Sequence, residues 1–209
     1  MLTLGRVDRV RVQVGYRARP DGPAHEQFLL DLPVPEADEA RDGEADYESQ
    51  VLAALEPVLY GGTAAPRHYS LHQHRSHNSW GPSPGTLDIG LLVTTGTRTA
   101  DSDESLDGVT RAFRDLLELA DRSEPVPTTR DAAILRARTA AGTAYAVDPD
   151  TLSISAEEHH QAENSWSVRL HTSAGDEFDV VVGLVDGYAG SVRVRHEKRT
   201  EVFDSVGSE

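Results

Sequence analysis

Histidines are the side chains in this sequence that offer the most chemistry, and they are unevenly spread. Four of the nine lie in one short segment, at His68, His72, His74 and His77. Side chains two positions apart on a β-strand point to the same face. On a strand, His72 and His74 would share a face with His68, close enough to hold one zinc, iron or manganese ion at about 2.0–2.1 Å. His72 and His74 are therefore candidate metal ligands. The competing interpretation, which we favour, is a solvated polar hairpin face.

A second histidine-rich segment lies in the other half of the chain. His159 and His160 precede an Asn-Ser-Trp triplet that ends at Trp166, and the first segment precedes another that ends at Trp80. We interpret this echo as chance similarity between two hairpins. A tryptophan at such a position is more often a plug at the edge of a core than a platform for a ligand. Both interpretations stay open, and the candidate ligand-binding residues are His72, His74, His77, Trp80 and Trp166.

Motifs of known enzyme classes are incomplete. His72-x-His74-x-Ser76-His77 resembles the His-x-His-x-Asp-His metal motif of metallo-β-lactamase-fold hydrolases, but Ser76 stands where that family has aspartate. Gly81-Pro82-Ser83-Pro84-Gly85 has the spacing of a serine nucleophile elbow. In an elbow the residue after the serine donates its backbone N–H to the oxyanion, and Pro84 has no N–H. Cysteine is absent, which excludes disulfides and thiolate sites. We predict no catalytic residue.

Composition narrows the classes of partner. The 209 residues include 35 acidic and 20 basic side chains, giving a net charge of −15. Such a field repels the phosphate backbone of nucleic acids and disfavours anionic membrane surfaces. The sequence lacks the run of about 18 apolar residues that a membrane-spanning helix needs, and its start has no apolar signal segment. We therefore expect a cytoplasmic protein that binds neither nucleic acid nor membrane.

Hydrophobic periodicity predicts an α+β fold with mostly antiparallel sheet or sheets and two or three helices. The predicted order is β-β-α-β-β-α, then a short helix ended by Gly142, and a β-meander. The first helix carries its apolar residues at Tyr47, Val51, Leu55 and Leu59, with Pro57 disturbing its last turn. An acidic loop over 36–48 precedes it, and Asp101 and Glu104 form a capping box before the next helix. The predicted divisions are a ββαββα subdomain (1–122), a linker (123–130) and a helix-plus-meander subdomain (131–209).

One stretch resembles a group of known modules. The run from Ser79 through Gly85-Thr86-Leu87-Asp88, with the strand Ile89–Val93 and the helix over 102–121, is similar to small α+β effector-associated modules of actinobacterial conflict systems. The shared features are generic, a glycine before a strand and then a helix. This resemblance implies a tethering or regulatory role rather than catalysis.

These observations favour a non-enzymatic interaction or regulatory protein that binds a protein partner. The acidic surface would suit a basic partner, and exposed strand edges could pair with another chain or with a second copy. The alternative is an enzyme or ligand-binding protein that uses the His-rich hairpin, with a divalent metal as its cofactor. Otherwise we predict no cofactor.

Overall fold

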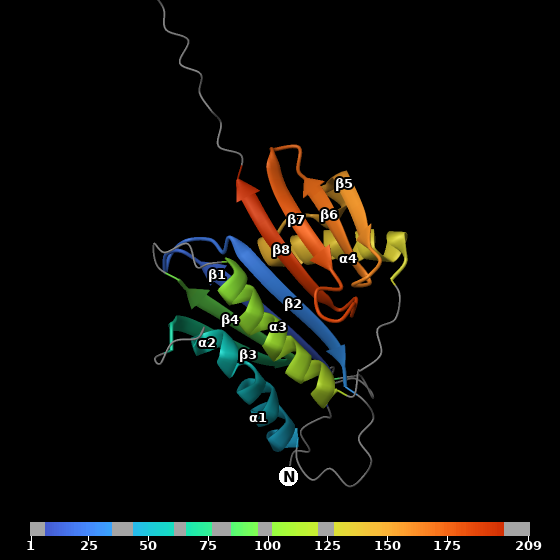
Figure 1. The fold of residues 1–209 in the computed structure, drawn as a ribbon. Coiled ribbons are helices and arrows are strands. Elements are labelled where there is room, and N and C mark those ends of the chain that lie inside the picture. Colours follow the sequence, from blue (N-terminus) through green and yellow to red (C-terminus); the bar gives the residue numbers. More distant parts are fainter. Residues whose placement is uncertain are drawn as a thin grey trace, which may run out of the picture.

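A computed structural model describes residues 7–34, 44–60, 66–76, 85–95, 102–120 and 128–198 of the chain. These residues form one eight-stranded sheet in the order β3-β4-β1-β2-β8-β7-β6-β5, with helices on both of its faces (Figure 1). The strands are β1 (Val7–Arg17), β2 (Glu26–Pro33), β3 (His68–Ser76), β4 (Gly85–Thr94), β5 (Ser153–His160), β6 (Ser165–His171), β7 (Asp176–Val182) and β8 (Ser191–Lys198). The helices are α1 (Glu44–Ala54), α2 (Glu56–Tyr60), α3 (Ser102–Leu119), α4 (Arg130–Tyr145) and the short 3-10 helix η1 (Pro149–Thr151).

The predicted α+β class is confirmed, and so is its mostly antiparallel sheet. Among the described strands, β1 and β4 make the one parallel pair, and all other neighbours run antiparallel. The alternation of valine with polar residues in β1 explains its position. Val10, Val12, Val14 and Tyr16 are buried on one face, whereas Arg11 on the other face is exposed. Such alternation is what a strand needs when only one of its faces is covered.

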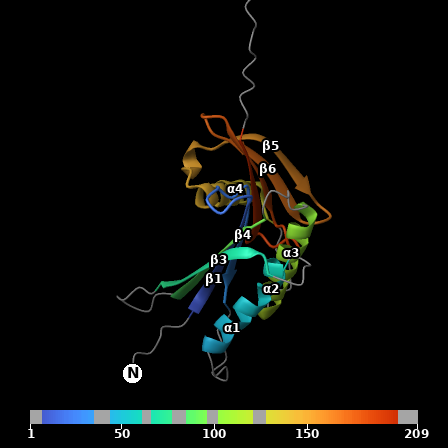
Figure 2. The ribbon, with the colours of Figure 1, turned by 90° about the vertical axis from the view of Figure 1, so that its left-hand side faces the viewer.

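The sheet has a first half, β3-β4-β1-β2, and a second half, β8-β7-β6-β5. The helices cover opposite faces of these two halves. In Figure 2, α1, α2 and α3 lie on one side of the strands and α4 lies on the other. Helices α1 to α3 pack over β1, β2 and β4, where they enclose the larger apolar core. Helix α4 packs against β6, β7 and β8. Each half of the sheet therefore keeps one face that none of the described helices covers.

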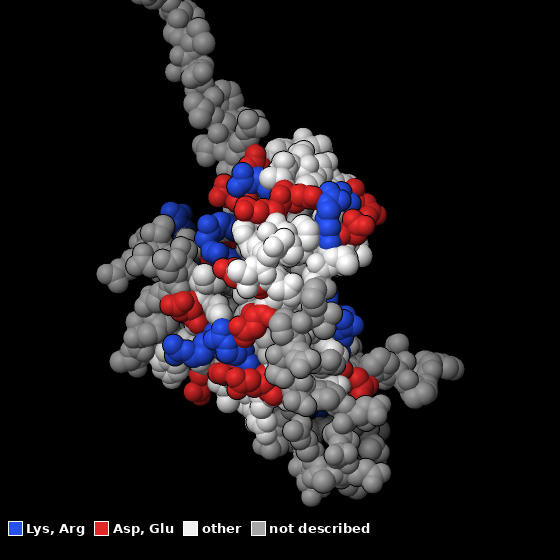
Figure 3. Space-filling view, turned by 45° about the vertical axis from the view of Figure 1, so that its right-hand side comes forward, with Lys and Arg blue, Asp and Glu red and all other residues white. Residues whose placement is uncertain are grey.

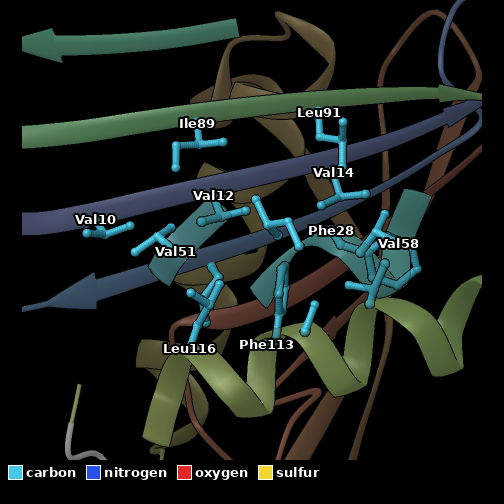
Figure 4. Packing of buried hydrophobic residues seen from close by; sticks show 14 of the residues in the cluster. Val10, Val12, Val14, Phe28, Val51, Val58, Ile89, Leu91, Phe113 and Leu116 are labelled. Carbon is cyan, nitrogen blue, oxygen red and sulfur yellow. The ribbon is translucent and has the colours of Figure 1, made fainter. Parts of the chain in front are cut away.

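The larger core depends on the apolar stripe of α3. Phe113 and Leu116 project from this helix toward the valines of β1 and Phe28 of β2 (Figure 4), and Val109 of the same helix belongs to this core. Phe28 and Phe113 are fully buried. Fully burying a side chain of this kind contributes about 1.5–3 kcal/mol to the free energy of folding. The helix predicted over 102–121 is thus confirmed over Ser102–Leu119, and its stripe anchors this half.

The smaller core is built on alanine. Ala137, Ala140 and Ala141 form the buried stripe of α4 that faces the sheet, against Val180 of β7 and Val194 of β8 among others. Small side chains let a helix approach a sheet closely, which suits the alanine stripe of α4. Leu29 of β2 packs against the edge of this core.

Strand β2 joins the two halves. It pairs with β1 on one side and with β8 on the other, over the residues Glu26 to Leu30. Its even-numbered side chains, such as Phe28 and Leu30, enter the larger core, whereas Leu29 contacts the smaller one. The division of the chain at 123–130 stays a prediction, but the strands on both sides of it belong to one sheet.

Two predicted helices differ in detail. The first is split at Leu55 into α1 and α2, because Pro57 near the start of α2 has no backbone N–H to continue the α1 ladder. Helix α1 begins at Glu44, so the predicted acidic loop is wrong over 44–48, and 35–43 lie outside the described residues. Asp101 of the predicted capping box also lies outside them.

Helix α4 does not end at Gly142, as the sequence predicts. It continues to Tyr145 and is capped by Ala146, which adopts a left-handed conformation with φ 54°. Gly142 is there for space, because a Cβ atom at this position would lie 2.7 Å from Cγ of Pro149 and from the carbonyl oxygen of Val147. The glycine lets the segment after the helix fold back against it. None of the described helices is long and apolar enough to cross a membrane.

A buried carboxylate fastens β2 to β8. The Glu26 side chain is 4% exposed, and its Oε1 lies 2.5 Å from Nη2 of Arg193 and 3.4 Å from Nη2 of Arg195. The Arg193 guanidinium also lies 5.9 Å from the centroid of the Phe28 ring. A buried charge that loses its partner costs far more than a surface ion pair gains.

We expect Glu26→Gln to lower the free energy of unfolding by about 1.5–3 kcal/mol, because it removes the negative charge that accepts hydrogen bonds from Arg193 and Arg195. Urea denaturation followed by circular dichroism measures this loss. Glu163→Gln, at an exposed turn position, is the matched control. Equal midpoints for the two variants would show that the buried pairs do not hold this junction.

Candidate functional site

The histidines of the first segment lie on β3, an edge strand of the sheet. His68, His72 and His74 are opposite Thr94, Gly90 and Asp88 of β4. They share one face of β3, as the spacing predicts, and this is the face of the first half that the described helices leave uncovered. His77 and Trp80 lie outside the described residues.

The two histidine segments do not converge. His72 and His74 lie on β3 at one edge of the sheet, and His159 and His160 lie on β5 at the other edge, with six strands between them. Within the described residues, no group of three or more histidine, aspartate or glutamate side chains is placed to hold a metal ion. The site that could use β3 therefore has to be built from its own neighbours.

Those neighbours enclose a hollow of about 650 Å³ that is open to solvent. Its floor is the uncovered face of β1, β2 and β4, with Gln13, Leu29 and Gly90. One wall is α4, through Arg136, Thr139 and Thr143, and His72 and His74 of β3 lie at the opposite side. Because α4 covers only the second half of the sheet, its side chains stand above the open face of the first half and bound that face on one side. The hollow is thus a direct result of placing helices on opposite faces.

A row of charged groups crosses the hollow from strand to strand. His74 of β3 is opposite Asp88 of β4, which is opposite Arg11 of β1, which is opposite Asp31 of β2. Directly opposed side chains in a sheet have Cβ atoms about 4.5–5.5 Å apart, so each member of the row can contact the next. Nη1 of Arg11 lies 3.8 Å from Oδ1 of Asp88, and both side chains are partly exposed.

The carboxylate of Asp31 is contacted by two arginine side chains. Arg9 makes a bidentate pair with it, through Nε at 2.5 Å and Nη2 at 2.7 Å from the two carboxylate oxygens. Arg136 reaches the same carboxylate from α4, with Nη1 at 3.4 Å from Oδ2. The hydrogen bond to Asp31 raises the pKa of the Arg9 guanidinium, against the opposing effect of partial burial. Asp31 therefore fixes two arginines and also ties α4 to β2.

A chain of amides makes a second tie between the sheet floor and α4. Gln13 donates to Oε1 of Gln27, and Nε2 of Gln27 donates to the carbonyl oxygen of Ala144 at 2.5 Å. Gln27 is buried, so these bonds satisfy polar atoms that would otherwise be costly to bury. The last turn of α4 is therefore held at a fixed height above the floor.

Trp166 has structural partners. Its ring packs against the smaller core, its Nε1 donates to the carbonyl oxygen of Thr128 at 3.0 Å, and the His159 ring stacks on it with centroids 4.4 Å apart. His196 stacks on Phe178 and lies 3.0 Å from Oδ1 of Asp176 through Nε2. These contacts place both residues in the smaller half, away from the hollow.

One contact has the distance expected between a serine nucleophile and the histidine that acts as its general base. Nε2 of His160 lies 2.8 Å from Oγ of Ser167, on the face of β5 and β6 opposite α4. Glu158 Oε1 is 3.9 Å from Nδ1 of this histidine, too far for a hydrogen bond, and its side chain is 74% exposed. A nucleophile also needs donors for the oxyanion, and Ser167 lies within a paired strand, where backbone N–H groups serve the ladder. The contact is a surface hydrogen bond.

Comparison with protein-family models, with curated proteins and with solved structures finds no match to this chain. The protein can therefore be classified only by its architecture. The described residues form an α+β fold with one mostly antiparallel eight-stranded sheet and a solvent-open hollow on the face that the helices of its first half leave uncovered.

The sequence identified only part of this hollow. It placed His72 and His74 on one face, and the alternation of β1 put Arg11 and Gln13 on its polar face. It missed Asp31, Asp88 and Arg136 as members of one site, because their meeting depends on the parallel pairing of β1 with β4 and on the position of α4. The available signal was an aspartate between two apolar residues in each strand, Asp31 in β2 and Asp88 in β4.

Two buried phenols give the fold a dependence on alkaline pH. Burial raises the pKa of Tyr16 and of Tyr145, and the negative charge of Glu26 adds to the rise at both. A phenol in the unfolded chain ionises near pH 10. The stability that these protonated phenols contribute is therefore complete below about pH 10 and is lost as the pH rises above it.

We expect Tyr16 and Tyr145 to ionise only as the protein unfolds in alkali. Tyrosinate absorbance and far-ultraviolet circular dichroism, followed in one pH titration, test this. Tyr145→Phe should remove about half of the absorbance change that accompanies unfolding. Complete ionisation of all six tyrosines with unchanged circular dichroism would contradict the assignment.

Proposed function

We propose that this protein is a non-enzymatic interaction protein that binds an extended segment of a protein partner along the outer edge of β3. The observation that carries the proposal is the character of this strand. Among the described residues β3 pairs only with β4, in unbroken register from His68 to Ser76. On its other side β3 pairs with none of the described strands, and an edge of this kind is where recognition by β-strand addition takes place.

The two edges of the sheet differ in a way that supports this choice. At the β5 edge the register with β6 shifts between Ile154 and Ala156, and the strand carries Glu157 and Glu158. Bulges and charges are the usual means of protecting an edge from pairing. Strand β3 has no register shift over its nine residues, and its one arginine, Arg75, is paired with Glu48 of α1. Its edge is the less protected of the two.

The side chains of β3 indicate what a partner strand would contact. Tyr69 and Leu71, which are 42% and 44% exposed, lie on the face that α1 to α3 cover further in. His72 and His74 lie on the other face. A partner strand would therefore alternate, with apolar side chains beside Tyr69 and Leu71 and polar ones beside the histidines. Tyr60, at the end of α2, is another exposed apolar group on this half.

Charge favours a different protein over a second copy. The chain carries −15, so two copies repel each other at long range, whereas a basic partner is attracted. On the side shown in Figure 3, acidic and basic side chains lie next to one another without a large area of one sign. The net field would therefore steer the encounter, and the strand contact would provide the affinity.

Site-specific photocrosslinking in the native host tests this location. A photoreactive residue at Tyr69 should link the chain to one defined partner, and the same residue at Ser155 on β5 is the matched control. In the isolated complex, the β3 amides should exchange hydrogen more slowly than in the free protein. Equal adducts at both positions, no adduct at Tyr69, or an adduct with a second copy would each overturn the proposal.

We expect Leu71→Lys to weaken partner binding about tenfold or more, because it removes an apolar contact and puts a charge on the edge. Affinity for the crosslinked partner, measured by calorimetry, gives the change. Ala156→Lys on β5 should leave the affinity within about twofold. The opposite ranking would show that the partner uses the other edge.

A second candidate function is ligand binding beside the histidine-rich strand. One observation favours it, which is that His72 and His74 line the hollow together with Arg11 and Arg136. Both functions would use His72 and His74, but Leu71 lies on the other face of β3, so a change at Leu71 tests the edge function without altering the lining of the hollow.

A further inference from the structure

We propose that the hollow binds a small organic anion, with a carboxylate or phosphate group held by Arg11 and Arg136 and an apolar body lying on the sheet floor. The inference rests on the second candidate function and adds the chemical class of the ligand. It is carried by the charges, donors and space that the described residues place together.

The hollow is less acidic than the chain as a whole. Arg11 and Arg136 balance Asp31 and Asp88 in its lining, and Arg9, which is outside the lining, makes a bidentate pair with Asp31. The chain as a whole carries −15. An anion repelled by most of the molecule would therefore find favourable charge at this location.

The cationic groups are held in place and keep donors for a ligand. Arg9 uses two of its donors on Asp31, and this pairing offsets the charge of the carboxylate. Arg136 contacts Asp31 at 3.4 Å through one nitrogen, and a guanidinium has five N–H donors. Arg11 is 55% exposed and lies 3.8 Å from Asp88, so most of its donors face the open hollow. His72 and His74 add ring nitrogens along the rim.

The floor has room for an apolar body. Leu29 lines it beside Gly90, and Ala140 of α4 lines the wall above. A Cβ atom at Gly90 would meet nothing nearer than Cβ of His72 at 3.8 Å. The glycine therefore leaves open the place that a side chain would fill. The volume of about 650 Å³ falls within the range of about 300–1,000 Å³ that is usual for small-molecule sites.

Nuclear magnetic resonance titration of the full chain tests the proposal with three probes that share a benzene ring. Benzoate and phenyl phosphate are the two anions, and benzamide is the uncharged control. At least one anion should shift the amide signals of Gly90, Gln13 and Thr139 in a saturable manner, while benzamide leaves them unchanged. The stronger of the two anions identifies carboxylate or phosphate as the group that is recognised.

Two variants and one control assign the binding to this hollow. Arg11→Gln should weaken the anion about tenfold or more, because a charge-assisted hydrogen bond is lost. Gly90→Leu should abolish saturable binding by filling the floor. Arg111→Gln, at an exposed position of α3 on the other face, should change the affinity by less than about twofold.

Three results would overturn the assignment: no saturable shift with either anion, equal binding of benzamide, or Gly90→Leu and Arg11→Gln that bind as well as the parent. If Gly90→Leu fails to fold, Arg11→Gln decides alone, because its side chain is exposed. Partner binding at β3 is measured separately with Leu71→Lys. A failure of anion binding with intact partner binding therefore rejects this inference and leaves the proposed edge function standing.

Discussion

The pairing of β2 with β8 is the constraint on which the rest of the structure depends. It makes one sheet of two halves and obliges β2 to serve two cores, with Phe28 and Leu30 on one face and Leu29 on the other. The apolar run Phe28-Leu29-Leu30 suits this position, because it supplies apolar side chains to both faces of the strand. The buried Glu26 and its two arginines lie at this junction, so an ionic contact and an apolar one secure the same pair of strands.

Opposite helix placement follows from this junction and creates both candidate surfaces. Because α1 to α3 cover one face and α4 the other, the first half keeps an open floor that α4 bounds at its far side. The outer strand of the same half, β3, forms the rim of the hollow with its histidines and presents Tyr69 and Leu71 on its other face. Strand β3 thus borders the hollow on one face and presents exposed apolar side chains on the other, and the two surfaces can be tested independently.

Local patterns predicted the elements, and long-range pairing determined the site. The alternation in β1, the stripe of α3 and the shared face of His72 and His74 all follow from spacing along a few residues. Arg136 and Asp31, by contrast, are separated by 105 positions, and their contact depends on where α4 lies over the sheet. Gly142 was misinterpreted for a similar reason, because the contact that requires it comes from Pro149 and not from its own turn.

The same junction has a consequence for biosynthesis. Arg195 follows Glu26 by 169 positions, so the side of β2 that awaits β8 stays unpaired on the ribosome until almost all the described chain has emerged. Contacts between residues this far apart in sequence form slowly, because the chain must lose the entropy of closing a long loop before the contact can stabilise the fold. An unpaired apolar strand in a nascent chain is prone to aggregation. Chaperone demand during translation is therefore expected to be set by the interval between synthesis of β2 and of β8.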